Sequence, residues 1–433
     1  MVKLEENKTR TEHRSVEILP APKQVFIPLV QHIGKPALPL VKAGERVLLG
    51  QAIADCEAVV SSPVHSSVSG KVTAIKNWPH PTLGTGNTIV IENDGMDTPA
   101  ASRLRQAEEI ERLTPDELRA IVRQAGIVGM GGAGFPSHVK LTPPKPVDTL
   151  ILNGAECEPY ATGDHRIMLE KAGEIIKGIM LITRSLKIQK VYIAIEDNKP
   201  DAIAVFRNEL LLMRKSGVCA SSLYQLRVLK SQYPQGGEKQ LIKNILHKEI
   251  PSGKLPFDVG VLVHNVGTVL AIYEAVYKSK PLYERVVTLT GDCLDSPKNL
   301  LVRIGTAIGE LVDFCTPLAM HPEKIIIGGP MMGITQYSTN APIIKTSGTV
   351  VLLSSKAVRF YREENCIRCG ECVRNCPVNI QPCMISLAAE RKNWELAKAY
   401  SPLDCIECGL CAYLCPAKRN LVQSIKMAKQ EAK

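Results

Sequence analysis

The sequence predicts a multidomain chain of α/β and β structure that ends in a helical, cysteine-rich unit. Short β-branched runs broken by glycine and proline fill the first hundred residues, strands then alternate with helices, and eight of the 14 cysteines form two runs near the end. A length of 433 residues suffices for several domains. From the changes in pattern we expect domains at residues 1–110, 111–256, 257–355 and 356–433.

The composition excludes several classes of protein. With 45% hydrophobic and 22% charged residues, the chain is neither disordered nor fibrous. No apolar run is long enough to span a membrane, and the charged residues 1–14 do not resemble a secretory signal, so we expect an intracellular protein. The net charge of +10 is spread along the chain and aromatic residues make up only 4%, which argues against nucleic-acid binding.

Residues 1–110 carry strand and turn signals with little helical periodicity. Hydrophobic runs are interrupted by Gly44, Gly50 and Gly70, and residues 59–72 are expected to form a second hairpin. These signals predict a small β barrel or sandwich similar to the lipoyl type. No lysine occurs in the tip context that would mark a cofactor-carrying arm.

From about Thr114 the pattern changes to strands that alternate with helices. Thr114 is a favourable N-cap and Pro115 suits the first helical position. The alternation predicts a Rossmann-like α/β unit with a mostly parallel sheet. A small α+β unit is expected at residues 282–330. The expected elements are residues 149–153, 164–186, 190–196, 200–215, 226–230, 238–247, 258–264, 269–277, 286–290 and 324–328.

The two cysteine runs have the spacing C-x2-C-x2-C-x3-C-P, which is typical of two-cluster bacterial ferredoxins. The first run is Cys366, Cys369, Cys372 and Cys376, and the second is Cys405, Cys408, Cys411 and Cys415. Because the fourth cysteine of each run ligates the other cluster in this pattern, we predict two [4Fe-4S] clusters with exchanged fourth ligands. Zinc is the alternative, but zinc sites use two pairs of ligands rather than two triplets. Ordinary thiols are expected at Cys56, Cys157, Cys219, Cys293, Cys315 and Cys383.

A glycine-rich segment precedes the first strand of the predicted parallel sheet. Gly129, Gly131 and Gly134 match G-x-G-x-x-G, with Gly132 between them. Three prolines follow closely and stop the long helix that a dinucleotide-binding turn would open. The segment therefore predicts a glycine loop capped by a short helix. Backbone N–H groups at that helix start, together with Lys140, favour a phosphate site over a flexible structural loop.

Polar and glycine residues follow three predicted strands. Asn153 is followed by Glu156 and Glu158, and two further turns lie at residues 233–239 and 264–268. Because open α/β sheets bind ligands at the carboxyl ends of their strands, we expect the three turns to line one cleft.

Together these motifs resemble the C subunit of the Rnf complex, a membrane-bound oxidoreductase that couples NAD(H) and ferredoxin to ion transport. The resemblance rests on GIVGMGGAGFPSHVKL, LNGAECEPYATGDHRIMLE, YPQGGEKQLI, HNVGT and the doubled cysteine runs. More distantly, the α/β unit is similar to the FMN-bearing, NADH-oxidising subunit of respiratory complex I. The resemblance implies a central FMN and NADH domain, a β-grasp unit of SLBB type, and a ferredoxin-like helical domain.

The resemblance to the flavin-bearing protein of complex I also implies the cofactor-binding residues. For FMN they are Gly129, Gly131, Gly132, Gly134, Lys140, Asn153 and Glu156, and the other two turns add Tyr233, Gly236, Glu238, Asn265 and Thr268. The chain departs from that pattern at Gly237, where a glutamate is expected, at Ala155, where an aspartate is expected, and at His264, where an asparagine is expected. Glu156 and Glu158 are the catalytic candidates, which we expect to set the electrostatics around nicotinamide and flavin.

The implied function is electron input to an ion-translocating ferredoxin:NAD+ oxidoreductase. NAD(H) exchanges two electrons as a hydride and each cluster takes one, so a flavin is needed to divide the pair. The implied partners are the integral-membrane and ferredoxin-like Rnf subunits, at the cytoplasmic side of the cell membrane. Two alternatives remain open, a flavin and iron–sulfur cobalamin reductase of a microcompartment and a relay subunit that has lost its flavin.

Overall fold

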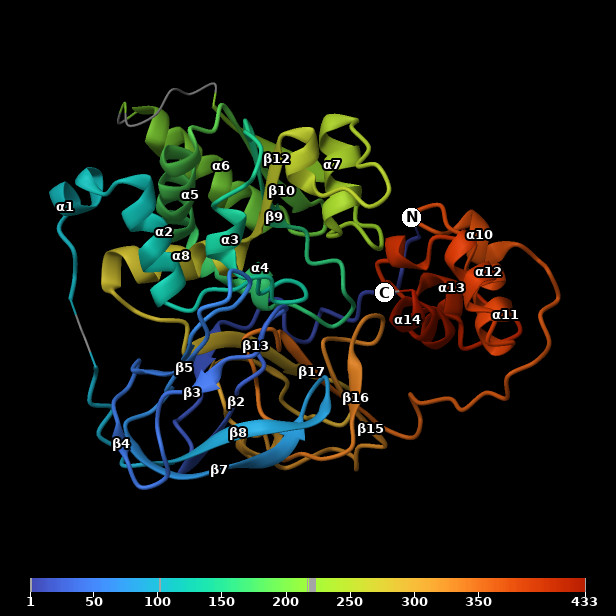
Figure 1. Ribbon diagram of the computed structural model, residues 1–433, viewed down its shortest axis with the longest axis horizontal. Helices are drawn as coiled ribbons and strands as arrows, with labels where there is room; N and C mark the ends of the chain where they lie inside the picture. The colour runs from blue at the N-terminus through green and yellow to red at the C-terminus, as the bar shows by residue number, and fades with distance from the viewer. Residues whose placement is uncertain (1, 101–102, 216, 218–222, 433) are drawn as a thin grey trace.

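Alternating hydrophobic residues fold the N-terminal part into two small antiparallel sheets (Figure 1). The computed structural model describes residues 2–100, 103–215, 217 and 223–432, and Cys219 lies outside them. The four-stranded sheet has the order β2 (Gln24–Pro28), β8 (Gly84–Asn93), β7 (Gly70–His80) and β4 (Arg46–Val47), and the three-stranded sheet the order β3 (Leu38–Pro39), β5 (Ala52–Asp55) and β6 (Val64–His65). The predicted small β unit is confirmed.

The hairpin expected at residues 59–72 is wrong. β6 pairs with β5, whereas β7 pairs with β4 and β8 in the other sheet. The chain changes sheets at Gly70, whose backbone lies so close to the Glu92 carbonyl that a side chain there would collide with it.

The central unit is a parallel sheet with the order β11 (Tyr224–Leu229), β10 (Lys190–Glu196), β9 (Thr149–Gly154) and β12 (Val261–Asn265). Alternate residues of the strands face opposite sides. One face packs against α2 (Pro115–Gln124), α4 (Gly163–Glu170), α5 (Ala172–Leu186), α6 (Pro200–Lys215) and α8 (Val266–Lys278). The other face is covered by α7 (Glu238–Leu246). The predicted α/β unit is thus confirmed.

Two predicted elements of this unit differ from the structure. The helix expected at residues 164–186 is two helices, because Lys171 has a non-helical backbone (φ −134°, ψ 23°). The strand expected from residue 258 begins at Val261, because residues Pro256–Val259 form a 3-10 turn (η1) that ends at Gly260 with a φ of +76°.

A six-stranded mixed sheet lies between the N-terminal unit and the C-terminal domain (Figure 1). Its order is β1 (Val16–Ile18), β14 (Lys298–Arg303), β13 (Glu284–Thr290), β17 (Thr349–Leu353), β15 (Lys324–Ile327) and β16 (Ile334–Gln336), with α9 (Ile308–Phe314) packed beside it. The N-terminal strand β1 therefore belongs to a sheet formed by residues almost 300 positions later.

The C-terminal domain is helical in the residues that the structure describes. It contains α10 (Glu371–Arg374), α11 (Pro382–Glu390), α12 (Trp394–Ala399), η2 (Pro402–Asp404), α13 (Leu410–Tyr413) and α14 (Leu421–Glu431). It stands beside α7 (Figure 1), where Lys239 pairs with Asp404 at 3.3 Å and Gln240 donates to the Pro377 carbonyl at 3.1 Å. Elsewhere, α1 (Ala107–Arg112) and α3 (Ser137–Lys140) flank α2. None of the described helices has the length and apolar character needed to cross a membrane.

Candidate functional site

The glycine loop runs from α2 to α3 and rests on the N-terminus of α8. Met130 N donates to Thr268 Oγ1 at 2.9 Å. A side chain at Gly131 would place its Cβ 2.7 Å from Asn265 Nδ2, so glycine is needed for this close approach. Apart from its two chain neighbours, no atom of the described residues lies within 4 Å of a Cβ built at Gly132, which leaves that part of the loop open. The structure thus brings the loop and the turn after β12 together.

The two other predicted glycines have structural contacts. Gly129 N donates to the Phe135 carbonyl at 2.9 Å, which closes the loop. Gly134 has a φ of +75°, and a Cβ there would lie 3.0 Å from Thr346 Cγ2 and 3.2 Å from the Gln31 carbonyl oxygen. Gly134 therefore packs against the N-terminal β unit.

Lys140, at the end of α3, lies beside the second glycine turn. Its Nζ forms an ion pair with Glu238 and donates to the Val263 carbonyl at 3.2 Å. The Lys140 side chain is 23% exposed and that of Glu238 is 41% exposed. The ammonium group is therefore accessible to an anion that replaces Glu238 as its partner.

Asn153 joins the first and second turns. Its side-chain amide donates to the Gly236 carbonyl at 2.9 Å and accepts from Ala155 N at 3.0 Å. A Cβ at Gly236 would lie 2.6 Å from the Ala155 carbonyl oxygen, so the two turns approach more closely than a side chain allows. The three strand-end turns therefore meet at one edge of the sheet, as the sequence predicts.

Glu156 points at the N-terminus of α4. Its carboxylate accepts from Asp164 N at 2.9 Å and from His165 N at 3.2 Å, where the helix dipole favours negative charge. Burial nevertheless raises the pKa of Glu156, and the Lys8 ammonium counters that rise. Asp164 was missed by the sequence analysis, although it contacts the site by accepting from Asn265 Nδ2 at 2.5 Å.

Glu158 points the opposite way, toward the turn between β15 and β16. Its carboxylate accepts from Met331 N at 2.7 Å and from Met332 N at 3.3 Å. Burial raises the pKa of Glu158 to about 7. The two glutamates predicted to act together therefore have separate environments and separate partners.

Tyr233 links the second turn to the cysteine domain. Its side chain is only 2% exposed and its hydroxyl donates to the Cys408 carbonyl at 2.7 Å. It packs with Cys408 and Leu410, with Met331 and Cys157 at the edge of the same cluster. This contact places one cysteine run directly against the cleft.

Four thiols from both cysteine runs line one pocket of about 310 Å³, solvent at its mouth included. They are Cys376, Cys405, Cys408 and Cys411, the set that the ferredoxin spacing assigns to one cluster. Four thiol groups in one pocket, which Gly409 also lines, fit an iron–sulfur cluster. In the first run, Cys372 is buried and Cys369 is exposed, and Cys415 of the second run is buried in the same domain.

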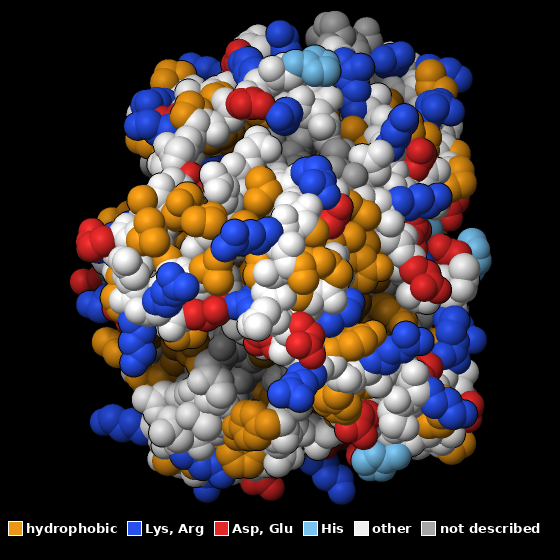
Figure 2. Space-filling model, turned by 90° about the vertical axis from the view of Figure 1, so that its right-hand side faces the viewer, with side chains coloured by type: hydrophobic (Ala, Val, Ile, Leu, Met, Phe, Trp, Pro, Cys, Tyr) orange, Lys and Arg blue, Asp and Glu red, His pale blue; other side chains and the backbone are white. Residues whose placement is uncertain are grey.

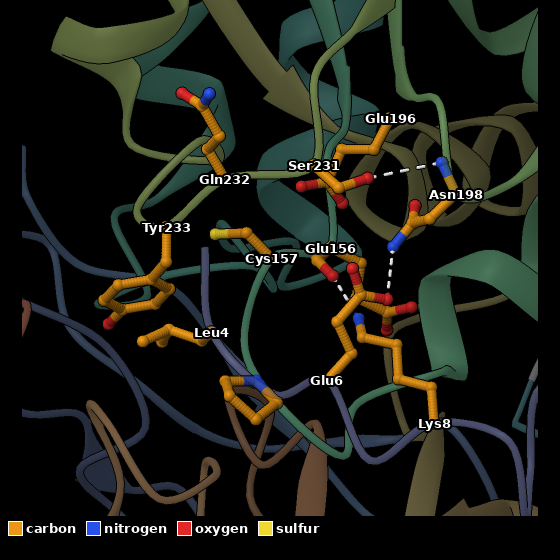
Figure 3. A pocket seen from close by; sticks show the side chains of 11 residues that line it. Leu4, Glu6, Lys8, Glu156, Cys157, Glu196, Asn198, Ser231, Gln232 and Tyr233 are labelled. Atoms are coloured by element: carbon orange, nitrogen blue, oxygen red, sulfur yellow. Dashed lines mark hydrogen bonds between the residues drawn. The ribbon is translucent and has the colours of Figure 1, made fainter. Parts of the chain in front are cut away.

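The N-terminal segment also reaches the site, which the sequence analysis missed. Lys8 Nζ donates to the Glu156 carbonyl, and Leu4, Glu6 and Lys8 line a pocket of about 270 Å³ together with Glu156, Cys157 and Tyr233 (Figure 3). The sequence contains only a weak signal for this segment, because just two hydrophobic residues, Val2 and Leu4, alternate with polar residues there.

Buried polar groups of the cleft that lack a hydrogen-bond partner support the presence of a bound flavin phosphate. Gln240 Oε1, beside Gly237, and His264 Nε2, near Lys140, are buried with no hydrogen-bond partner among the described residues. Burial, and then Lys140, lower the pKa of His264 to about 3, so this imidazole is neutral. Unpaired buried groups of this kind indicate a missing ligand. His264 lies close to the ammonium group of Lys140, which suits an anion, whereas the side chain of Gln240 reaches the Pro377 carbonyl of the C-terminal domain.

Family models match three parts of the chain. The RnfC barrel sandwich hybrid domain matches residues 2–96, the Nuo51 FMN-binding domain matches residues 122–274, and a 4Fe-4S dicluster domain matches residues 365–419. The predicted FMN and two-cluster domains are confirmed. Among solved structures, an NAD+-reducing [NiFe]-hydrogenase in the H2-reduced state has a similar fold, with a TM-score of 0.53, 16% identity, and coverage of 75% of this chain and 64% of that chain.

Curated relatives match nearly the whole chain. The C subunit of the proton-translocating ferredoxin:NAD(+) oxidoreductase complex of Clostridium ljungdahlii is 45% identical over 99% of this chain and 92% of its own length. The C subunit of the Na(+)-translocating complex of Acetobacterium woodii is 44% identical over 95% and 91%, and that of the ion-translocating oxidoreductase complex of Rhodobacter capsulatus is 41% identical over 98% and 81%. The chain therefore belongs to the family of C subunits of the ion-translocating ferredoxin:NAD+ oxidoreductase, or Rnf, complexes.

Proposed function

We propose that this chain is the electron-input subunit of an ion-translocating ferredoxin:NAD+ oxidoreductase. One observation carries the proposal: Tyr233, in the turn that the family assigns to flavin binding, donates a hydrogen bond to the backbone of the cluster ligand Cys408. A flavin site and a one-electron centre in direct contact are what conversion between hydride and single-electron transfer requires. The relatives' names support the same activity.

The residues of the cleft have separable roles in this proposal. Lys140 and the backbone at Gly132, which has open space beside it, bind the flavin phosphate. Asn153 joins the turns after β9 and β11, and Asn265 joins the turn after β12 to α4, so both hold the backbone around the ring system. Glu158, with a pKa of about 7, holds or releases a proton at its carboxylate near neutral pH. The flavin, when bound, exchanges a hydride with NAD(H) and single electrons with the clusters.

The order of the clusters follows from their positions. The pocket of Cys376, Cys405, Cys408 and Cys411 adjoins Tyr233, whereas Cys369 and its neighbour Ile367, which is 67% exposed, lie at the surface. The proposed path therefore enters the Cys405–Cys411 run first and leaves through the Cys366–Cys372 run. Figure 2 shows the C-terminal domain side of the molecule, where apolar side chains alternate with Lys and Arg.

The site of action that we propose is the cytoplasmic face of the cell membrane, where the chain binds peripherally to the integral-membrane and ferredoxin-like Rnf subunits. The relatives' printed names, which describe subunits of translocating complexes, support this placement. They do not favour a cobalamin reductase. The flavin-less relay is disfavoured by the match to an FMN-binding domain.

Cofactor analysis of the anaerobically purified chain tests this function. We expect FMN and about eight iron atoms with equivalent acid-labile sulfide per chain, and cluster signals in electron paramagnetic resonance (EPR) spectra after addition of NADH. Protein that contains zinc and no sulfide, or clusters that NADH leaves oxidised in the FMN-loaded protein, contradicts the proposal.

A further inference from the structure

The N-terminal segment, residues 2–8, crosses the carboxyl edge of the parallel sheet as a strap that is extended up to Glu6 and turns at Asn7, whose φ is +51°. Its side chains alternate, since Val2, Leu4 and Glu6 are half-buried and Lys8 is buried, while the residues between them are exposed. An extended chain sends alternate side chains to opposite sides. One side of the strap therefore faces the site that the previous sections describe.

The strap is attached to the turns that follow three of the four strands of the parallel sheet, β11, β10 and β9. At the turn after β11, Val2 and Tyr233 exchange two backbone hydrogen bonds of 3.0 and 2.8 Å. At the turn after β10, Asn198 Nδ2 donates to Glu6 Oε2 at 2.7 Å. At the turn after β9, Tyr160 N donates to the Glu6 carbonyl at 2.8 Å. The pocket that remains, about 270 Å³, is below the usual range for ligand sites, so the strap itself occupies this edge (Figure 3).

Lys8 is the buried end of the strap. It is 4% exposed, and its ammonium donates to the Glu156 carbonyl (Figure 3). The neighbouring carboxylate of Glu196 already has a partner, because Lys199 pairs with it at 2.8 Å. The Lys8 charge is therefore available to the carboxylate of Glu156, whose own pKa it lowers. A buried ammonium is costly unless carboxylates and carbonyls surround it, so its position here indicates a specific role.

We propose that Lys8 is a positioning residue of the flavin site, which fixes the turn at residues 155–158 through the Glu156 carbonyl and offsets the negative charge of the Glu156 carboxylate. The inference rests on the proposed function. It adds a part of the chain outside the α/β unit to the cofactor site. It also explains why the strap contacts Tyr233 and the Glu156 turn together, because both must hold their places around one ligand.

Flavin affinity of the apoprotein tests this inference, with Lys3→Met as the matched control. Lys3 lies on the exposed side of the same strap, so the two substitutions remove the same charge from opposite sides. We expect Lys8→Met to weaken FMN binding at least tenfold, Lys8→Arg to restore much of the affinity, and Lys3→Met to leave it unchanged. Fluorescence quenching of FMN titrated with apoprotein measures the dissociation constants.

The midpoint potential of the bound flavin gives a second readout. A loss of packing alone would not shift this potential in a fixed direction. Reduction adds negative charge to the flavin site, and a nearby ammonium stabilises that charge. We therefore expect a more negative flavin midpoint potential in Lys8→Met than in the wild type or Lys3→Met. Wild-type affinity and potential in Lys8→Met would overturn the inference.

Two further controls keep the outcome clear. If Lys8→Met does not retain its iron, Asn198→Ala removes the hydrogen bond to Glu6 while Lys199 keeps its ion pair with Glu196, and an unchanged FMN affinity in that variant also overturns the inference. A wild-type chain that binds no flavin contradicts the proposed function instead. If the wild-type chain binds flavin, but no more tightly than Lys8→Met does, only the role of Lys8 is contradicted.

Discussion

At the scale of single residues, the site depends on a few charges whose environments differ. Lys140 is partly exposed and pairs with Glu238, whereas Glu156 and Glu158 are half-buried and accept hydrogen bonds from backbone N–H groups. The sequence predicts a pair of glutamates, but the structure turns one toward α4 and the other toward the six-stranded sheet. Each therefore has its own testable role.

Replacement of Lys140 by alanine tests the phosphate site. We expect Lys140→Ala to weaken FMN binding about tenfold or more, because a charge-assisted contact to phosphate is lost. NADH oxidation with an artificial acceptor should fall in parallel and recover at high FMN concentration. Lys145→Ala is the matched control, since Lys145 pairs with Asp258 on the outer surface. Equal FMN affinity in both variants would remove Lys140 from the site.

Glu158→Gln tests the raised pKa of Glu158. Because the folded value of about 7 lies above the ordinary 4.5, the carboxyl group stabilises the fold fully below pH 4.5 and loses that contribution as the pH rises through 7. The wild-type melting temperature should therefore fall more steeply between about pH 5 and pH 7 than that of Glu158→Gln, which stays neutral. Anaerobic thermal unfolding measures both curves, and parallel curves would contradict the assignment.

At the scale of elements, the site is built where loops meet helix starts. Gly131 touches the α8 N-terminus through Asn265, whereas Gly132 faces open space. The sequence identifies both as one glycine motif, because spacing alone cannot say which glycine serves packing and which serves a ligand. The structure distinguishes the two glycines, because a side chain at Gly131 would collide with Asn265 whereas a side chain at Gly132 would enter open space.

Two alanine variants test that separation. Gly131→Ala should lower the melting temperature of the apoprotein, because its Cβ would meet Asn265. Gly132→Ala should leave the melting temperature unchanged and weaken FMN binding, because its Cβ would fill space that only a ligand uses. Thermal unfolding with and without FMN distinguishes the two effects. A large loss of apoprotein stability in Gly132→Ala would show that the loop is packed there too.

At the scale of the whole molecule, the chain joins distant segments around one path for electrons. The α/β unit, the strap and the second cysteine run meet at Tyr233. In the first run Cys369 is exposed, whereas Cys408 and Cys411 of the second run are buried. The two clusters therefore have unequal positions, although their sequences are almost repeats.

Cysteine replacements test both the ligand exchange and the order of the clusters. Cys376→Ser should disturb the cluster of the second run, although Cys376 belongs to the first run. In that variant NADH should no longer reduce the remaining cluster efficiently. Cys369→Ser should leave the cluster near Tyr233 reducible. EPR spectra of the NADH-reduced proteins measure these outcomes, and the reverse pattern would exchange the order of the clusters.

The sequence by itself determined the cofactor classes, the spacing of the two cysteine runs and the alternation of strands with helices. These features depend on local spacing, because ligands within one loop and residues on one face of a strand or helix are set by backbone geometry over a few positions. Only the tertiary structure decided that Glu156 and Glu158 diverge, that Lys8 reaches the cleft, that β1 joins a sheet of residues 284–353, and which cysteine run adjoins Tyr233. Each of these depends on contacts between segments far apart in the chain, and no local pattern encodes where such segments meet.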